Sequence, residues 1–221
     1  MKTHFPKKQS GFTLVEIAIV LVIIGLLLGG VLKGAELIEN SKVRKTISQI
    51  NGVAAAYYSY LDRYSKSPGD DGPIATLQAR GSSWAGVSAG NNNNSFVALN
   101  QHFASGGGEQ GTFWQHLKAA GFIPGKPADT GVNAMPKNAF SGIIGITTEA
   151  VGGGLTGIKV CLSQVTGTAA ASLDLQLDDG NGATGKFRAR LSRHGIDDWP
   201  DNIVLAAPYS EDQYYTVCSK I

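Results

Sequence analysis

The stretch GFTLVEIAIVLVIIGLLLGGVL, residues 11–32, decides the architecture of this chain. From residue 17 to residue 32 every position is apolar or glycine, and with the residues just before it the run reaches about the 20 residues that cross a ~30 Å hydrocarbon core. The short leader contains Lys2, Lys7 and Lys8 and no acidic residue, which predicts that this end stays in the cytoplasm. The sequence therefore predicts one membrane-spanning helix, with the remainder of the chain outside the cytoplasm.

Glu16 is the only charged residue in residues 11–32. A carboxylate inside an apolar helix is costly unless it is solvated, protonated or paired. Two interpretations remain open at this point. Either Glu16 lies near the membrane–water interface and is solvated or protonated, or it meets a positive charge supplied from elsewhere.

The basic leader, Gly11, Phe12, the Thr-Leu-Val-Glu that ends at Glu16 and the apolar run follow one another in a specific order. This order resembles the class III signal of type IV prepilins and type II secretion pseudopilins. The resemblance implies that a membrane peptidase cleaves after Gly11 and that the new N-terminal Phe12 is N-methylated. It also implies polymerisation through the N-terminal helix, in which the Phe12 amine of one subunit neutralises Glu16 of a neighbour.

The resemblance implies a structural subunit of a type IV pilus or a type II secretion pseudopilus, and not an enzyme. The alternative is a minor tip subunit that binds DNA, a surface or a secreted substrate. The implied partners are other pilin-like subunits, the prepilin peptidase/methyltransferase, the inner-membrane assembly machinery and, before assembly, membrane lipid. The implied location is the inner membrane, with a single span and the C-terminus outside the cytoplasm, and later a periplasmic or cell-surface filament.

A helix is predicted to continue from the membrane-spanning run as far as Tyr64, before Ser67-Pro68-Gly69 ends it. Beyond Lys33 its apolar residues recur at steps of three and four, which places them on one face. That face consists of Val43, Ile47, Ile50, Ala54, Tyr57, Leu61 and Tyr64. The predicted divisions are a leader (1–11), a transmembrane helix (12–33), an amphipathic continuation (34–66) and an exported domain (67–221).

The exported domain is rich in glycine and turn formers, with candidate strands of alternating or β-branched residues. One short helix is predicted over residues 112–120, capped by Thr112 and ended by Gly121. Residues 168–178 are predicted to form a second helix, from Thr168 as cap to Gly180 as stop, although Leu173, Leu175 and Leu177 alternate as in a strand. The four predicted strands are residues 142–148, 157–162, 186–191 and 214–217.

The predicted fold class is α+β, with a long N-terminal helix, membrane-spanning in its first half, packed on a small antiparallel sheet. A pilin-like fold is also what the resemblance implies. The two cysteines, Cys161 and Cys218, can pair if the domain lies outside the cytoplasm, or they can remain buried thiols. The family resemblance implies a C-terminal disulfide between them that pins the last loop to the sheet.

A calcium site is one possible cofactor site in this sequence. Asp178, Asp179 and Asn181 offer oxygen ligands in a tight glycine-containing turn. Some pseudopilins, which this chain resembles, bind calcium in a C-terminal loop. The spacing is not that of an EF-hand, and an Asx-type turn with no metal is the alternative interpretation.

Lys186, Arg188 and Arg190 alternate along one predicted strand and therefore share a face. Such a basic stripe is a candidate nucleic-acid contact, and the alternative is an exposed face balanced by nearby aspartates such as Asp197. The net charge of +2 is too small to indicate bulk nucleic-acid affinity.

Enzymatic motifs are not found in the sequence. The four histidines lack metal-ligand spacing and are predicted to lie on the surface, and no phosphate-binding glycine loop or recognisable nucleophile motif occurs.

Overall fold

The computed structural model describes residues 11–205 and 208–221 of the chain. The predicted leader, with Lys2, Lys7 and Lys8, therefore lies outside the described residues except for Gly11. The chain divides into a smaller unit, Met1–Ser41, and a larger unit, Lys42–Ile221. Its longest element is helix α1 (Leu14–Tyr64), which runs through residues of both units.

The predicted end of α1 is confirmed. After Tyr64, Ser65 takes a left-handed conformation with φ 51°, and its N–H still donates to the Leu61 carbonyl at 2.8 Å. The buried face of α1 is rotated from the predicted one, because Ile47 and Tyr64 lie only at its margin. The fully buried residues are Val43, Thr46, Ile50, Val53, Ala56, Tyr57 and Tyr60.

The larger unit contains one four-stranded antiparallel sheet of strand order β1-β2-β4-β3. Its strands are β1 (Ile144–Thr147), β2 (Lys159–Thr166), β3 (Phe187–Ser192) and β4 (Tyr214–Lys220). All four strands occur where the sequence predicts them, and the α+β class is confirmed. The strands β2 and β4 are longer than predicted because they pair with each other along most of their length, with an irregularity near Gln164 in β2.

Two helices were predicted with the wrong start. Helix α3 (Gly108–Ala119) begins before Thr112, whose hydroxyl bonds the Gly69 and Glu109 carbonyls instead of capping the helix. Gly121 ends this helix with φ 78°, as predicted. Helix α4 (Gly167–Leu177) confirms the helical interpretation, but Thr168 lies inside it and is not its cap.

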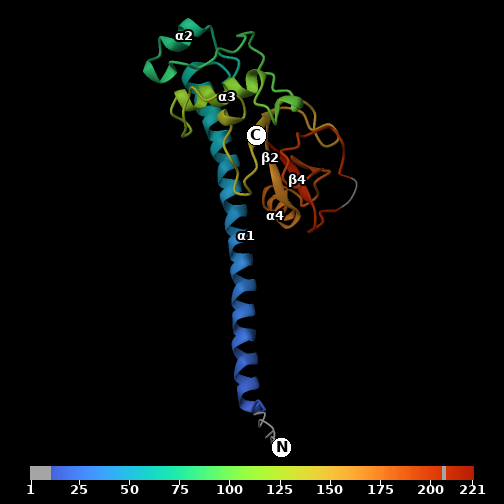
Figure 1. Ribbon diagram of the computed structural model, residues 1–221. Helices are drawn as coiled ribbons and strands as arrows, with labels where there is room; N and C mark the ends of the chain where they lie inside the picture. The colour runs from blue at the N-terminus through green and yellow to red at the C-terminus, as the bar shows by residue number, and fades with distance from the viewer. Residues whose placement is uncertain (1–10, 206–207) are drawn as a thin grey trace, which may run out of the picture. The chain divides into compact units, whose positions relative to one another are not determined.

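The remaining helices are short. They are α2 (Ile74–Gln78) and three single 3₁₀ turns, at Ser82–Trp84, Asn100–His102 and Gly131–Ala134. Figure 1 shows β2 and β4 side by side with α4 next to them. It also shows α3 beside the C-terminal half of α1, where the rings of Tyr57 and Phe113 stack at 6.3 Å.

A buried polar centre joins the end of α1 to the loops that follow it. The Tyr60 hydroxyl donates to Asp71 at 2.7 Å, and Arg80 reaches the same carboxylate at 2.8 Å. The Arg80 guanidinium lies 4.8 Å from the ring centroid of Trp84, a cation–π distance. A buried carboxylate is tolerated here because both a charge and a hydroxyl satisfy it.

His116 is buried in the same centre, so its predicted surface position is wrong. Its Nδ1 accepts the Gly69 N–H at 3.0 Å, and its Nε2 lies 2.8 Å from the Ser88 carbonyl. The first bond requires an unprotonated Nδ1 and the second a protonated Nε2, which fixes one neutral tautomer. Burial lowers the pKa of His116, and Arg80 acts in the same direction, while the Ser88 bond and Asp71 oppose the shift.

We expect the stability of the larger unit to fall as the pH is lowered through 6.5, the ordinary pKa of histidine. The unfolded chain binds a proton on His116 near this pH, whereas the folded chain does so only at lower pH. The contribution of neutral His116 to the free energy of unfolding is therefore fully present above pH 6.5. Below that pH it declines, by up to about 1.4 kcal/mol per pH unit.

Urea unfolding of the detergent-solubilised chain between about pH 5 and pH 7 measures this slope. The variant His116→Gln should be less stable at neutral pH and should show a flatter dependence. His194→Gln, at an exposed histidine, is the matched control and should keep the wild-type slope. Equal slopes for wild type and His116→Gln would contradict the assignment.

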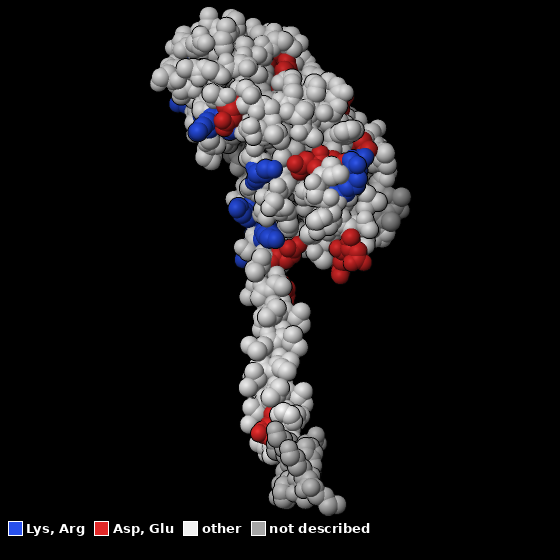
Figure 2. Space-filling model, in the orientation of Figure 1, with Lys and Arg blue, Asp and Glu red and all other residues white. Residues whose placement is uncertain are grey.

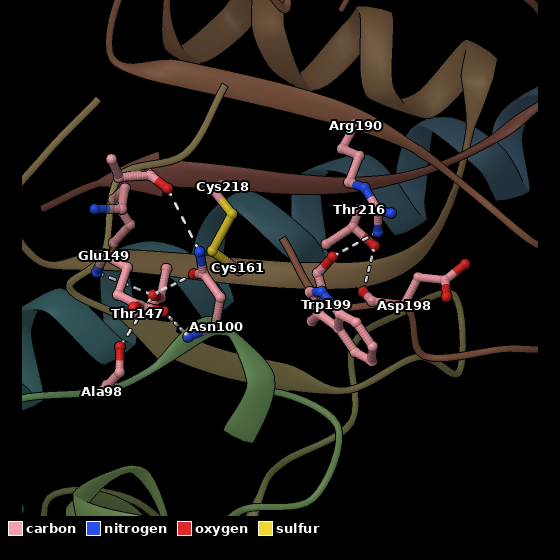
Figure 3. The surroundings of a disulfide bond; sticks show 12 residues. Ala98, Asn100, Thr147, Glu149, Cys161, Arg190, Asp198, Trp199, Thr216 and Cys218 are labelled. Carbon is pink, nitrogen blue, oxygen red and sulfur yellow. Dashed lines mark hydrogen bonds between the residues drawn. A yellow bond between two sulfur atoms is a disulfide. The ribbon is translucent and has the colours of Figure 1, made fainter. Parts of the chain in front are cut away.

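The predicted disulfide is present between Cys161 and Cys218. The position of the disulfide differs from the one expected. It joins directly opposed residues of the neighbouring strands β2 and β4 and does not pin a loop to the sheet. Figure 3 shows polar anchors near it, among them the Thr216 hydroxyl, which donates to the Asp198 carbonyl at 2.8 Å. The last long loop is therefore held by hydrogen bonds and ion pairs beside the disulfide.

Removing both cysteines, as Cys161→Ala with Cys218→Ala, should lower the free energy of unfolding by about 4 kcal/mol, because the 57-residue separation closes a long loop in the unfolded chain. Guanidinium unfolding measures the loss, and the wild-type chain with its disulfide reduced should behave alike. A difference below about 1 kcal/mol would show that the bond adds little to this sheet.

Candidate functional site: the N-terminal segment

The first half of α1 displays a continuous apolar surface. Among the described residues, α1 is the one helix that is long and apolar enough to span a membrane. Its apolar 18-residue window has a mean hydropathy of 2.8, and no residue of that window is buried. The exposed fractions reach 85% at Phe12 and 91% at Leu14. Such a surface is unfavourable in water and needs lipid or other helices around it.

The predicted cleavage position lies before the helix. Gly11, Phe12 and Thr13 are exposed and precede the first helical residue, Leu14. A Cβ placed on Gly11 would meet no atom within 4 Å. The peptide bond between Gly11 and Phe12 is therefore accessible and free of helical hydrogen bonds, as a peptidase requires of its substrate.

Thr13 and Glu16 form a reciprocal cap at the start of α1. Oε2 of Glu16 accepts the Thr13 N–H and the Thr13 hydroxyl, both at 2.8 Å. The Glu16 N–H in turn lies 3.2 Å from the Thr13 hydroxyl oxygen. This is a capping box, and the sequence pattern that encodes it is Thr-x-x-Glu. This local pattern was not recognised from the sequence, and it supplies Glu16 with a partner inside its own chain.

The cap uses one oxygen of the carboxylate. Both Thr13 donors go to Oε2 of Glu16, and Oε1 has no hydrogen-bond donor among the described residues. A carboxylate oxygen accepts more than one hydrogen bond, and a cation near a helix N-terminal carboxylate is favoured by charge. The geometry therefore lets Glu16 cap its own helix while it receives a positive group.

The glycines of the apolar run do not interrupt the helix. Gly25, Gly29, Gly30 and Gly34 lie within the continuous α1, and a Cβ on any of them would meet nothing within 4 Å. The open space beside them allows another helix to approach closely.

The predicted calcium ligands lie in a network of turns after α4. Carboxylate oxygens of Asp174, Asp178 and Asp179 come within 4.8 Å of one another, so the structure adds Asp174 to the predicted group. Asp179 accepts the Asn181 N–H at 2.9 Å, and Asn181 accepts the Ala183 N–H at 3.1 Å, which are Asx turns.

The other two carboxylates also have protein donors. Asp178 accepts the Phe187 N–H at 2.9 Å, and Asp174 accepts the Tyr209 hydroxyl at 2.6 Å. Burial raises the pKa of Asp174 despite that bond. These contacts favour the turn interpretation, since each carboxylate already has a donor without a metal. Calcium binding stays a prediction.

The predicted basic stripe is largely engaged within the chain. Lys186 is exposed, but Arg188 donates to the Gly152 carbonyl at 3.0 Å. Arg190 pairs with Asp201 at 2.7 Å and donates to the Trp199 carbonyl at 2.7 Å. Figure 3 shows Arg190 beside Trp199. These partners favour a structural role for the two arginines, and nucleic-acid contact stays a prediction.

Comparison with known proteins gives one match, to the family model of the prokaryotic N-terminal methylation motif, over residues 6–32. No curated protein and no solved structure matches the chain. The matched residues include Gly11, Phe12 and Glu16 and most of the exposed apolar surface of α1. This chain therefore carries the N-terminal signature of type IV prepilins and pseudopilins, ahead of an α+β unit that is consistent with a pilin-like fold.

Proposed function

We propose that this chain is a structural subunit of a type IV pilus or a type II secretion pseudopilus. In this proposal it is cleaved after Gly11, N-methylated on Phe12 and polymerised through α1. The observation that carries the proposal is that the methylation motif, residues 6–32, includes the first part of α1, which no other described residue covers. That family is structural, which agrees with a subunit that catalyses no reaction.

The exposed apolar segment supports two successive environments for the subunit, first lipid and then other subunits. Before assembly, lipid covers the segment, in a single inner-membrane span with the C-terminus outside the cytoplasm. After assembly, equivalent helices of neighbouring subunits cover it in a periplasmic or cell-surface filament. In this scheme residues 1–11 are the leader, 12–33 the membrane and assembly helix, 34–66 its continuation and 67–221 the exported domain.

Glu16 supports ordered polymerisation. Cleavage after Gly11 would create a positive amine on Phe12. Phe12 immediately precedes Thr13, which donates two hydrogen bonds to Glu16. Oε1 of Glu16 has no donor among the described residues, so it can receive the Phe12 amine of a neighbouring subunit. Each charge alone is costly in an apolar filament core, and pairing offsets part of the cost of burying both.

Mass spectrometry of the membrane-extracted chain, coexpressed with a prepilin peptidase/methyltransferase, tests the processing. The mature chain should begin at Phe12 and carry one N-terminal methyl group. A Gly11→Arg variant should keep its leader, because a long side chain now occupies the position before the cut. A mature wild-type chain that retains Lys2, or that begins beyond residue 32, would refute the proposal.

A pair of variants separates the charge of Glu16 from its capping role. Glu16→Gln keeps an acceptor for Thr13 but removes the charge, and it should lower the filament yield by about tenfold or more while insertion and cleavage continue. Thr13→Val removes the capping hydroxyl but keeps the charge, and its yield should stay within about threefold of wild type.

Sheared filaments, quantified against membrane-inserted subunit, give the yield for both variants. Normal assembly of Glu16→Gln would remove the charge-pairing step. A loss in Thr13→Val as large as that in Glu16→Gln would reduce the role of Glu16 to capping.

A further inference from the structure

On the outer face of α1 in the larger unit, two cations have no partner among the described residues. Val43, Ile50 and Tyr57 mark the buried face, and at about 100° per residue Arg44 and Lys45 point away from it. Both side chains are exposed, and neither has a hydrogen bond or ion pair with any described residue. An exposed, unpaired basic pair on a rigid helix is available to another molecule.

The two cations of α1 that precede this pair are already engaged. Lys33 pairs with Glu36 at 2.8 Å, and the amine of Lys42 lies 5.6 Å from the centre of the Phe140 ring. Figure 2 shows the basic side chains that line α1 where it joins the rest of the larger unit. Arg44 and Lys45 are therefore the members of this basic region that lack a partner within the described residues.

An acidic pair is held on the tip of a turn before β4. Glu211 and Asp212 are exposed at its centre, and neither has a partner among the described residues. The turn is fixed on both sides, because the Gln213 N–H donates to the Ser210 carbonyl at 3.2 Å and the Gly167 N–H donates to the Gln213 carbonyl at 3.0 Å. The Ser210 N–H also donates to the Tyr215 hydroxyl at 2.9 Å.

Several other charges of the larger unit are paired within the chain. Arg80 is matched with Asp71, Arg190 with Asp201, and Arg193 with Asp198, all within one chain. The basic pair on α1 and the acidic pair before β4 do not meet one another within the chain. Two exposed pairs of opposite sign, one on a helix and one on a hydrogen-bonded turn, are complementary between two copies of the molecule.

We propose that Arg44 and Lys45 of one copy bind Glu211 and Asp212 of an adjacent copy in the filament. This inference rests on the proposed polymerisation. It identifies a contact between neighbouring subunits that lies outside the membrane-spanning segment. One surface binds a different surface of the next copy, so the contact is heterologous, and such contacts generate open helical polymers when the rotation does not close.

The neighbours of the basic pair are compatible with close approach. Ser41 and Ser48 lie one turn before and after Arg44 on the same side of α1, and both are exposed and small. A Cβ on Gly52, a further turn along, would meet nothing within 4 Å. An acidic turn can therefore reach Arg44 and Lys45 without displacing a large side chain.

Charge reversal in the full-length chain tests the contact. Arg44→Glu with Lys45→Glu, and separately Glu211→Lys with Asp212→Lys, should each lower the filament yield by about tenfold, because attraction becomes repulsion at every subunit. The fourfold variant with both reversals should recover to within about threefold of wild type. Lys126→Glu, at an exposed lysine outside both pairs, is the control and should assemble normally.

Zero-length carbodiimide cross-linking gives a direct readout. Filaments grown from a mixture of isotope-labelled and unlabelled subunits should yield a peptide that joins Lys45 to Glu211 or Asp212, with one half labelled. The mixed label shows that the link is between copies, and its yield should fall as salt screens the attraction during assembly.

The outcomes separate this inference from the function it rests on. Normal assembly of either reversed pair, or a fourfold variant that stays as poor as its parents, overturns the contact while the filament function stands. Loss on reversal of the basic pair alone, with no effect of the acidic reversal, also overturns it and assigns Arg44 and Lys45 to anionic lipid headgroups. If the wild-type chain forms no filament, the proposed function itself fails.

Discussion

The apolar surface of the first half of α1 is the constraint on which the rest of the molecule depends. Residues 17–32 contain no polar side chain, and the described structure provides no cover for them. Removing apolar surface from water is favourable by roughly 25 cal/mol per Å², and here the gain accumulates over many exposed side chains. The chain therefore needs lipid or other helices around this segment.

The sequence was most informative where periodicity and turn chemistry act locally. The apolar run, the end of α1 at Tyr64, the four strands and the helix ended by Gly121 were all predicted from patterns within a few residues of one another. Gly11 and Phe12 were recognised because the motif is contiguous, and the match over residues 6–32 supports that recognition. The cysteine pairing followed from the resemblance, but its place between two adjacent strands did not.

Features that depend on tertiary contacts were missed. Nothing near His116 in the sequence indicates that its ring accepts the Gly69 N–H, because that partner lies 47 residues away. Alternation along the strand predicted a basic stripe, but Arg190 pairs with Asp201. A strand pattern shows which face a side chain lies on and does not show its partner. The Thr13–Glu16 cap is different, because its signal is local and was available from the sequence.

If the chain assembles as proposed, that cap has a consequence for how a subunit leaves the bilayer. A bare carboxylate moving through hydrocarbon would present a barrier at every extraction step. Oε2 of Glu16 has two Thr13 donors within its own helix, and in the proposed assembly Oε1 would exchange a solvent or headgroup contact for an amine. In that scheme the acid would keep hydrogen-bond donors on the path from membrane to filament, which would lower the kinetic barrier to adding one more subunit.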